Sequence, residues 1–184
     1  FSDKNFILKY IKRKNKKIKK DKKFNILKEV SKQNYFSTKS KIRKASINSK
    51  EIKKNDVFFA IRGKTKDGNL FLKEAFDKGA SLAVVNRINK SVKRNKQIKV
   101  ENSLDFLTRT SKIVRANSNG KIIAITGSCG KTSLKELLVK TLVKFGKVTF
   151  SPKSFKNKYG VPLSLFNLNP DHEYGIFEVG MDKK

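Results

Sequence analysis

The stretch KIIAITGSCGKTS, residues 121–133, decides the fold. Its first six residues are mostly β-branched or small and apolar, which is typical of a strand buried on both faces of a parallel sheet. The run leads directly into a glycine-rich turn. Apolar residues at helical spacing then predict a helix whose inward face holds Leu134, Leu137, Leu138, Leu142 and Phe145. A strand, a tight turn and a helix in this order predict one unit of an α/β layer.

The turn itself has the composition of a phosphate-binding loop. Glycines let the backbone curl so that successive N–H groups point at a phosphate, and the following helix N-terminus favours negative charge. Lys131 is the candidate catalytic residue, since it would reach the terminal phosphates, and the Thr132 hydroxyl would bind Mg²⁺. The residues expected to bind the nucleotide are Gly127, Ser128, Cys129, Gly130, Lys131, Thr132 and Ser133.

The loop does not match the eight-residue pattern G-x-x-x-x-G-K-S/T, because Ile125 stands where the first glycine belongs. What remains is the shorter form T-G-x-x-G-K-S/T. The alternative interpretation is a glycine-rich turn followed by a lysine with no role in phosphate binding. The flanking strand and helix favour the phosphate loop.

Upstream of this loop, predicted strands alternate with predicted helices, which indicates a second α/β layer. Apolar runs predict buried strands at residues 56–61, 81–85 and 97–100. Helices are expected at residues 24–30, 70–78 and 103–115. In the helix at 70–78, Phe71, Ala75 and Phe76 are expected to share the inward face.

A cluster of turn-forming residues, Asn117–Gly120, marks the expected domain boundary. We expect a basic tail or linker at residues 1–23, a small α/β domain at 24–117, and the start of a P-loop-type parallel-sheet domain at 118–184. The chain begins without Met and stops after a strand-like run. It is therefore expected to be a fragment.

The net charge of +30 by itself suggests nucleic acid or an anionic membrane surface as a partner. However, seven of the 45 basic residues are Arg, which leaves 38 Lys spread over nearly every polar segment. Proteins that read nucleic acid rely on Arg for bidentate contacts. The pattern therefore favours an overall compositional bias, in which lysines fill the solvent-exposed surfaces. A Lys-rich nucleic-acid-binding protein with an incidental glycine turn remains an alternative.

A single Cys leaves no internal disulfide and fits a reducing cytoplasm. No apolar run approaches the roughly 20 residues that cross a membrane, and the first ten residues do not have the pattern of a signal peptide. The expected location is cytoplasmic.

The short loop form resembles that of the Mur ligase family, the amide-forming enzymes of peptidoglycan assembly. Residues 46–63 resemble the family's D-S-R…G-D-x-F-x-A-x-x-G segment, and residues 66–80 resemble its D-G-H-x-F…A…G-A continuation. The resemblance covers about residues 24–184. It implies an N-terminal domain that binds a UDP-linked substrate, followed by an ATP-binding domain, with ATP and Mg²⁺ as cofactors.

Two features indicate which branch of the family is most similar. Lys135-Glu136 follow the loop as in G-K-T-x-x-K-E, and residues 156–165 resemble N-N-x-x-G-V-P-L-T-L. That branch joins D-alanyl-D-alanine to a UDP-MurNAc-tripeptide, so these are the implied substrates. A sister ligase that adds the third amino acid is one alternative, and a small P-loop kinase is another. The resemblance implies that the 184 residues alone are inactive, because the remaining contacts would lie further along the chain.

The resemblance also carries site residues. Glu178, in the E-x-G that ends the last expected strand, would help to bind Mg²⁺, and Asn157 would lie near the nucleotide. Ser49 and Lys50 would contact the UDP moiety. The sequence departs from the family pattern at four positions, Asn48, Lys50, Asn69 and Lys156, which replace Asp, Arg, His and Asn. The first three weaken the assignment of the UDP contacts.

The first residues, Phe1–Lys4, and the helix expected after them resemble the C-terminal tail of the preceding ligase of the family. One hypothesis is therefore a fusion to that ligase. The other is an unrelated basic N-terminal extension.

Overall fold

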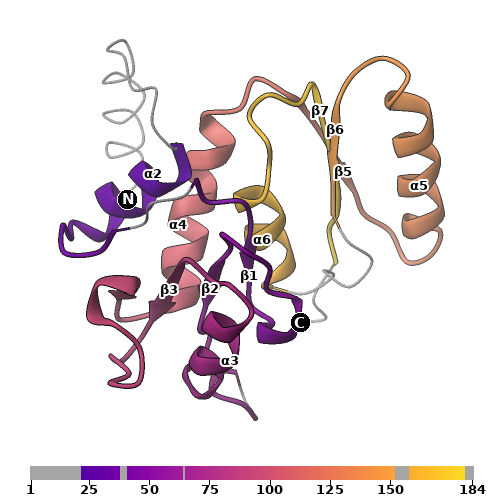
Figure 1. Cartoon of the computed structure of the whole chain (residues 1–184). Coiled ribbons are helices and arrows are strands. Elements are labelled where there is room, and N and C mark those ends of the chain that lie inside the picture. The colour runs from indigo at the N-terminus through magenta and orange to yellow at the C-terminus, as the bar shows by residue number, and fades with distance from the viewer. Residues whose placement is uncertain (1–21, 38–40, 64, 152–157, 181–184) are drawn as a thin grey trace, which may run out of the picture. The chain divides into compact units, whose positions relative to one another are not determined.

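The computed structural model describes residues 22–37, 41–63, 65–151 and 158–180 (Figure 1). They divide into two compact units, one ending at Thr110 and the other beginning at Ser111. The tail at residues 1–21, on which the fusion hypothesis depends, and Asn157 lie outside the described residues.

The first unit contains a parallel four-stranded sheet in the order β1-β2-β3-β4. Its strands are β1 (Ala45–Ser46), β2 (Val57–Phe59), β3 (Leu82–Val85) and β4 (Gln97–Lys99). Its α-helices are α2 (Lys22–Ser31) and α3 (Leu72–Asp77), with 3₁₀ turns η2 (Ser49–Glu51), η3 (Gly68–Phe71) and η4 (Arg94–Lys96). The three strands expected from the sequence are confirmed, whereas β1 was not predicted.

Small and aromatic side chains from the strands pack against α3 to form the core of this unit. Phe58, Ala83 and Val85 are buried there with Leu72 and Ala75. Phe71 was predicted to share this inward face, but it is exposed. The reason is that Asp67 accepts a hydrogen bond from the Asn69 amide at 2.9 Å and caps a 3₁₀ turn, so the α-helix begins only at residue 72.

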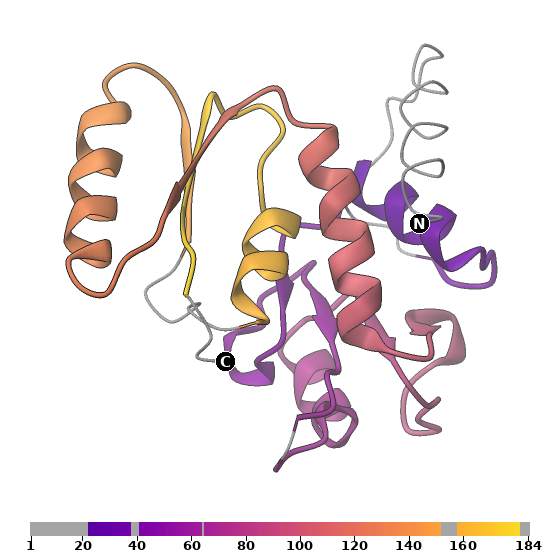
Figure 2. The same ribbon diagram turned by 180° about the vertical axis from the view of Figure 1, so that it is seen from behind.

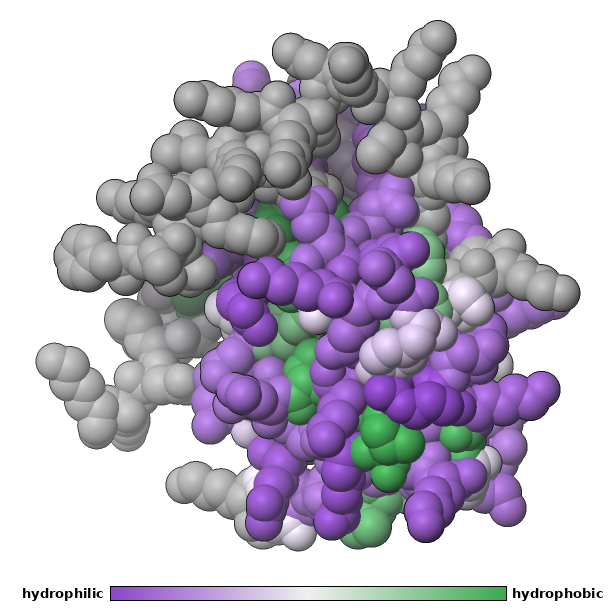
Figure 3. Space-filling view, turned by 90° about the vertical axis from the view of Figure 1, so that its left-hand side faces the viewer, coloured by the Kyte–Doolittle hydropathy of each residue, from purple (hydrophilic) through white to green (hydrophobic). Residues whose placement is uncertain are grey.

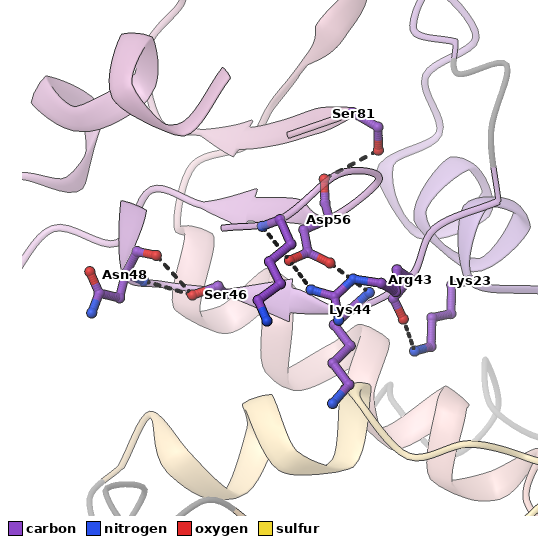
Figure 4. Close-up of polar contacts among 8 residues, drawn as sticks. Lys23, Arg43, Lys44, Ser46, Asn48, Asp56 and Ser81 are labelled. Carbon is purple, nitrogen blue, oxygen red and sulfur yellow. Dashed lines mark hydrogen bonds and ion pairs between the residues drawn. The ribbon is translucent and has the colours of Figure 1, made fainter. Parts of the chain in front are cut away.

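A buried carboxylate, Asp56, connects the segments on either side of β1 (Figure 4). It accepts hydrogen bonds from Arg43 Nη2 at 2.6 Å, the Lys44 amide at 3.1 Å and the Lys53 amide at 2.9 Å. The Ser81 amide donates to the Asp56 carbonyl at 2.8 Å. Asp56 therefore fixes the course of the chain before β1 and after η2.

The helix α4 (Ser103–Ala116) contains the division between the two units, and the second unit continues into a parallel sheet in the order β5-β7-β6. Its elements are β5 (Lys121–Ile125), α5 (Lys131–Leu142), β6 (Val148–Phe150), α6 (Gly160–Phe166) and β7 (Tyr174–Glu178). Figure 2 shows α5 and α6 on opposite faces of this sheet. The sequence predicted β5, α5 and β7 but not β6 or α6.

Two expectations about burial in the second unit are wrong. Lys121 and Ala124 of β5 are exposed, although the strand was expected to be buried on both faces. Leu134, Leu137 and Phe145 were expected to face inward but are 46%, 62% and 71% exposed. The sheet has only three strands with β5 at its edge, and α5 packs mainly on the central β7, so the described elements are too few to bury both faces of β5 and the whole apolar face of α5.

Hydrophilic residues dominate the face of the molecule shown in Figure 3, and the hydrophobic residues between them form small separate patches. This distribution agrees with lysines that fill solvated surfaces. Among the described helices, none is both long and apolar enough to cross a membrane.

Candidate phosphate-binding site

The parallel pairing of β5 with β7 places the glycine-rich loop beside Glu178. Ile125 is opposite Glu178 in the register, and the Val179 amide donates to the Ile125 carbonyl at 2.9 Å. The loop that follows β5 and the carboxylate that ends β7 therefore lie at the same edge of the sheet. This is the carboxyl edge, where open α/β sheets bind ligands.

The backbone of the loop curls at its two glycines. Gly127 has φ 139° and Gly130 has φ 73°, conformations that L side chains rarely adopt. A Cβ added to Gly130 would meet nothing within 4 Å, so the space beside it is open. The helix α5 begins at Lys131, and its first amides have no acceptor within the helix. These amides are available to an anion in that open space.

Lys131 folds back over the loop that precedes it. Its Nζ donates hydrogen bonds to the carbonyls of Gly127 and Ser128, the second at 3.3 Å. The neighbouring Ser128, Cys129 and Ser133 are exposed. A bound phosphate would offer the ammonium group a stronger, charged acceptor than these carbonyls.

Thr132 and Glu178, the two predicted metal-binding residues, lie in contact. The Thr132 hydroxyl donates to Glu178 Oε2 at 3.3 Å, and the carboxylate is 2% exposed. The other carboxylate oxygen, Oε1, forms an ion pair with Lys135 Nζ at 2.8 Å. The two oxygens of Glu178 therefore have different partners, one on the loop side and one in the interior.

Ser151, directly after β6, completes this buried group. Its hydroxyl accepts a hydrogen bond from the Glu178 amide at 3.1 Å, and its carbonyl accepts one from Lys135 Nζ at 3.1 Å. Glu178 is thus held through both its main chain and its side chain. The sequence interpretation used Lys135 only as part of a family motif. Its spacing of four residues from Lys131, one helical turn, was the available signal that both share a face of α5.

The donor set fits Mg²⁺ bound mainly through a nucleotide. In the described part of the chain, no group of three or more His, Cys, Asp and Glu residues could hold a metal ion. Mg²⁺ normally keeps several waters and binds one or two protein oxygens together with substrate phosphates. One hydroxyl and one carboxylate oxygen next to a phosphate loop meet that requirement.

The two predicted UDP contacts lie in the first unit, on η2. Ser49 is buried, and its hydroxyl donates to Glu74 Oε2 at 2.7 Å, which holds the pKa of that carboxyl below its usual value. Lys50 is exposed, and its carbonyl accepts a hydrogen bond from Lys78 Nζ at 3.2 Å. The side chain of Lys50 is therefore open to a ligand, while that of Ser49 already has an acceptor.

Two domains of one protein family match the chain, one after the other along the sequence. The Mur ligase family, catalytic domain, matches residues 41–115, and the Mur ligase middle domain matches residues 125–184. The second match contains the phosphate loop from Ile125 onward, as well as Lys135, Ser151 and Glu178.

Individual relatives are ligases whose names include UDP-N-acetylmuramoyl peptides. The chain is 40% identical over 136 residues to the UDP-N-acetylmuramoyl-tripeptide–D-alanyl-D-alanine ligase of Rickettsia prowazekii, covering 73% of this chain and 30% of the relative. It is 37% identical over 107 residues to the UDP-N-acetylmuramoyl-L-alanyl-D-glutamate–2,6-diaminopimelate ligase of Rickettsia montanensis, covering 58% and 22%. The chain therefore spans less than a third of the length of these curated relatives.

A solved structure supports the same assignment. The MurF ligase of Thermotoga maritima, in complex with ADP, is 34% identical with a TM-score of 0.59, covering 74% of this chain and 32% of that one. Because catalytic-domain and middle-domain matches follow one another along the sequence, the chain belongs to the Mur ligase family.

Proposed function

We propose that this chain is the substrate-binding and phosphate-binding part of an ATP-dependent ligase that joins D-alanyl-D-alanine to a UDP-MurNAc-tripeptide. The observation that carries the proposal is the contact of Thr132 with Glu178 beside a curled glycine loop. The wider match to the D-alanyl-D-alanine ligases, 136 residues against 107 for the diaminopimelate ligase, supports the choice of substrate.

In the proposed reaction, a carboxylate oxygen of the tripeptide attacks the γ-phosphorus of ATP, and ADP leaves. The amine of D-alanyl-D-alanine then attacks the carbonyl carbon of the resulting acyl phosphate. It loses a proton as the amide forms and inorganic phosphate leaves. Negative charge is concentrated on the phosphate oxygens throughout, so positioning and charge stabilisation are the main contributions that a protein can make.

The residues of the loop supply these contributions. The amides at the start of α5 bind phosphate oxygens, and Lys131 turns from the Gly127 and Ser128 carbonyls to the terminal phosphates. Thr132 and Glu178 would hold Mg²⁺, which would supply positive charge to offset the negative charge of the phosphates. Asn157 is proposed near the nucleotide from the family motif alone, since it lies outside the described residues.

In the first unit we propose that the UDP moiety binds at η2. The exposed Lys50 ammonium is the candidate for a diphosphate contact, because a lysine side chain binds phosphate as a point charge. Ser49 supports the same turn through its hydrogen bond to Glu74.

The test is phosphate release by the full-length enzyme with the UDP-tripeptide and ATP. Release should require D-alanyl-D-alanine, and Lys131→Ala should lower it by about 10²–10³-fold, the usual cost of losing a well-placed electrostatic group. Lys140→Ala is the matched control, because Lys140 is an exposed lysine of the same helix. Release that depends instead on a single amino acid would identify a sister ligase, and full activity of Lys131→Ala would remove the loop from the mechanism.

A further inference from the structure

A buried lysine behind the phosphate loop has no part in the mechanism described so far. Lys135 is in the second turn of α5, and its side chain is 3% exposed. A lysine is almost never fully buried unless it has a partner. Here the partners are Glu178 Oε1 at 2.8 Å and the Ser151 carbonyl at 3.1 Å.

Stability alone is a weak explanation for this ion pair. Removing two charges from water costs free energy that their attraction often does not recover, and apolar residues of similar volume stabilise a fold as well or better. The pair does have a geometric consequence. It holds one oxygen of Glu178 toward the interior and leaves Oε2 directed at Thr132, 3.3 Å away.

We propose that Lys135 is a positioning residue: it fixes the Glu178 carboxylate so that Oε2 faces the phosphate loop and can act as a ligand to Mg²⁺. This inference rests on the proposed function. The Lys135 ammonium group contacts Glu178 and the Ser151 carbonyl, so its proposed effect on Mg²⁺ is exerted through Glu178. Residues that bind and orient a metal-coordinating side chain typically change the metal affinity about 10–100-fold when they are removed.

The test measures binding rather than turnover. The affinity of the full-length protein for ADP is determined calorimetrically without divalent cation and again over a series of Mg²⁺ concentrations. For Lys135→Met, we expect unchanged affinity for metal-free ADP. The Mg²⁺ concentration at which the increase in ADP affinity is half-maximal should be roughly 10–100-fold higher than in the wild type. A purely structural defect would weaken ADP binding with and without Mg²⁺ alike, and that outcome would overturn the proposal.

Two further variants sharpen the result. Lys140→Met removes an exposed lysine from the same helix and should behave as wild type. Lys135→Gln keeps one donor toward Glu178, so it should give a smaller change in the same direction. It also serves as the test variant if Lys135→Met does not fold.

A double-mutant cycle then shows whether Lys135 acts through Glu178. In a Glu178→Gln background, Lys135→Met should cause no further increase in the Mg²⁺ requirement, because the ligand that it positions is already lost. Independent, additive losses would contradict the proposal. The proposed function fails separately, if wild-type ADP binding is insensitive to Mg²⁺ and to Lys131→Ala.

Discussion

At the residue scale, the structure separates side chains that are open to a ligand from those already used by the fold. Lys50 and the loop amides belong to the first group, whereas Ser49 and Lys135 belong to the second. The sequence alone predicts the chemistry of each side chain. It does not show which hydrogen bonds are already made, because those partners come from distant segments such as Glu74 and Ser151.

The hydrogen bond from Ser49 to Glu74 gives a prediction about pH. The Ser49 hydroxyl is the main cause that lowers the pKa of Glu74, with Lys78 adding to it. A lowered folded-state pKa means stability that is present above the ordinary value of 4.5 and is lost as the pH falls toward the folded value. Ser49→Ala should raise the Glu74 pKa, as measured by NMR titration of its side-chain carboxyl. An unchanged titration would show that the hydrogen bond is absent in solution.

At the scale of the element, the pattern of apolar residues identified most helices and strands of the first unit. It failed for β1, β6 and α6. β1 contains only two residues, too few for a pattern to show. β6 is as short as the confirmed β2, but none of its residues is buried and Phe150 is 52% exposed, so it lacks the apolar run of a buried strand. The pattern also failed for the inward face of α5, since periodicity shows that a helix has an apolar face but not which element covers it. The position of Glu178 beside the loop was expected from the resemblance of residues 175–181 to the family's strand ending in E-x-G, and parallel strands do bring their carboxyl ends to one edge.

Asp56 provides a test of how the elements of the first unit are held. Asp56→Ala would remove the acceptor of the part-buried Lys44 and Lys53 amides, and a hydrogen bond to a charged group is worth about 1.5–3 kcal/mol. We expect the free energy of the opening reaction that exposes the β2 amides to hydrogen exchange to fall by an amount on the order of 3 kcal/mol. Asp77→Ala, at an exposed position at the end of α3, should leave this protection unchanged. Equal protection in both variants would show that Asp56 does not stabilise β2.

At the scale of the whole molecule, the charge of +30 invites a different function. If the lysines only solvate the surface, the full-length protein should bind a mixed-sequence DNA duplex no more tightly than about 10⁻⁴–10⁻⁶ M at physiological salt, the non-specific range. A fluorescence anisotropy titration at several salt concentrations measures this. Nanomolar binding that is unaffected by Lys131→Ala would favour a nucleic-acid-binding protein.

The central claim is that the main-chain amides at the start of α5, with Lys131, bind nucleotide phosphates. The most direct measurement is a crystal structure of the full-length protein with ADP and Mg²⁺. We expect the phosphates within hydrogen-bonding distance of the amides from Gly130 to Thr132, with Lys131 Nζ moved from the Gly127 carbonyl to a phosphate oxygen. ADP bound elsewhere, or bound here while Lys131 keeps its contact with Gly127, would contradict the account.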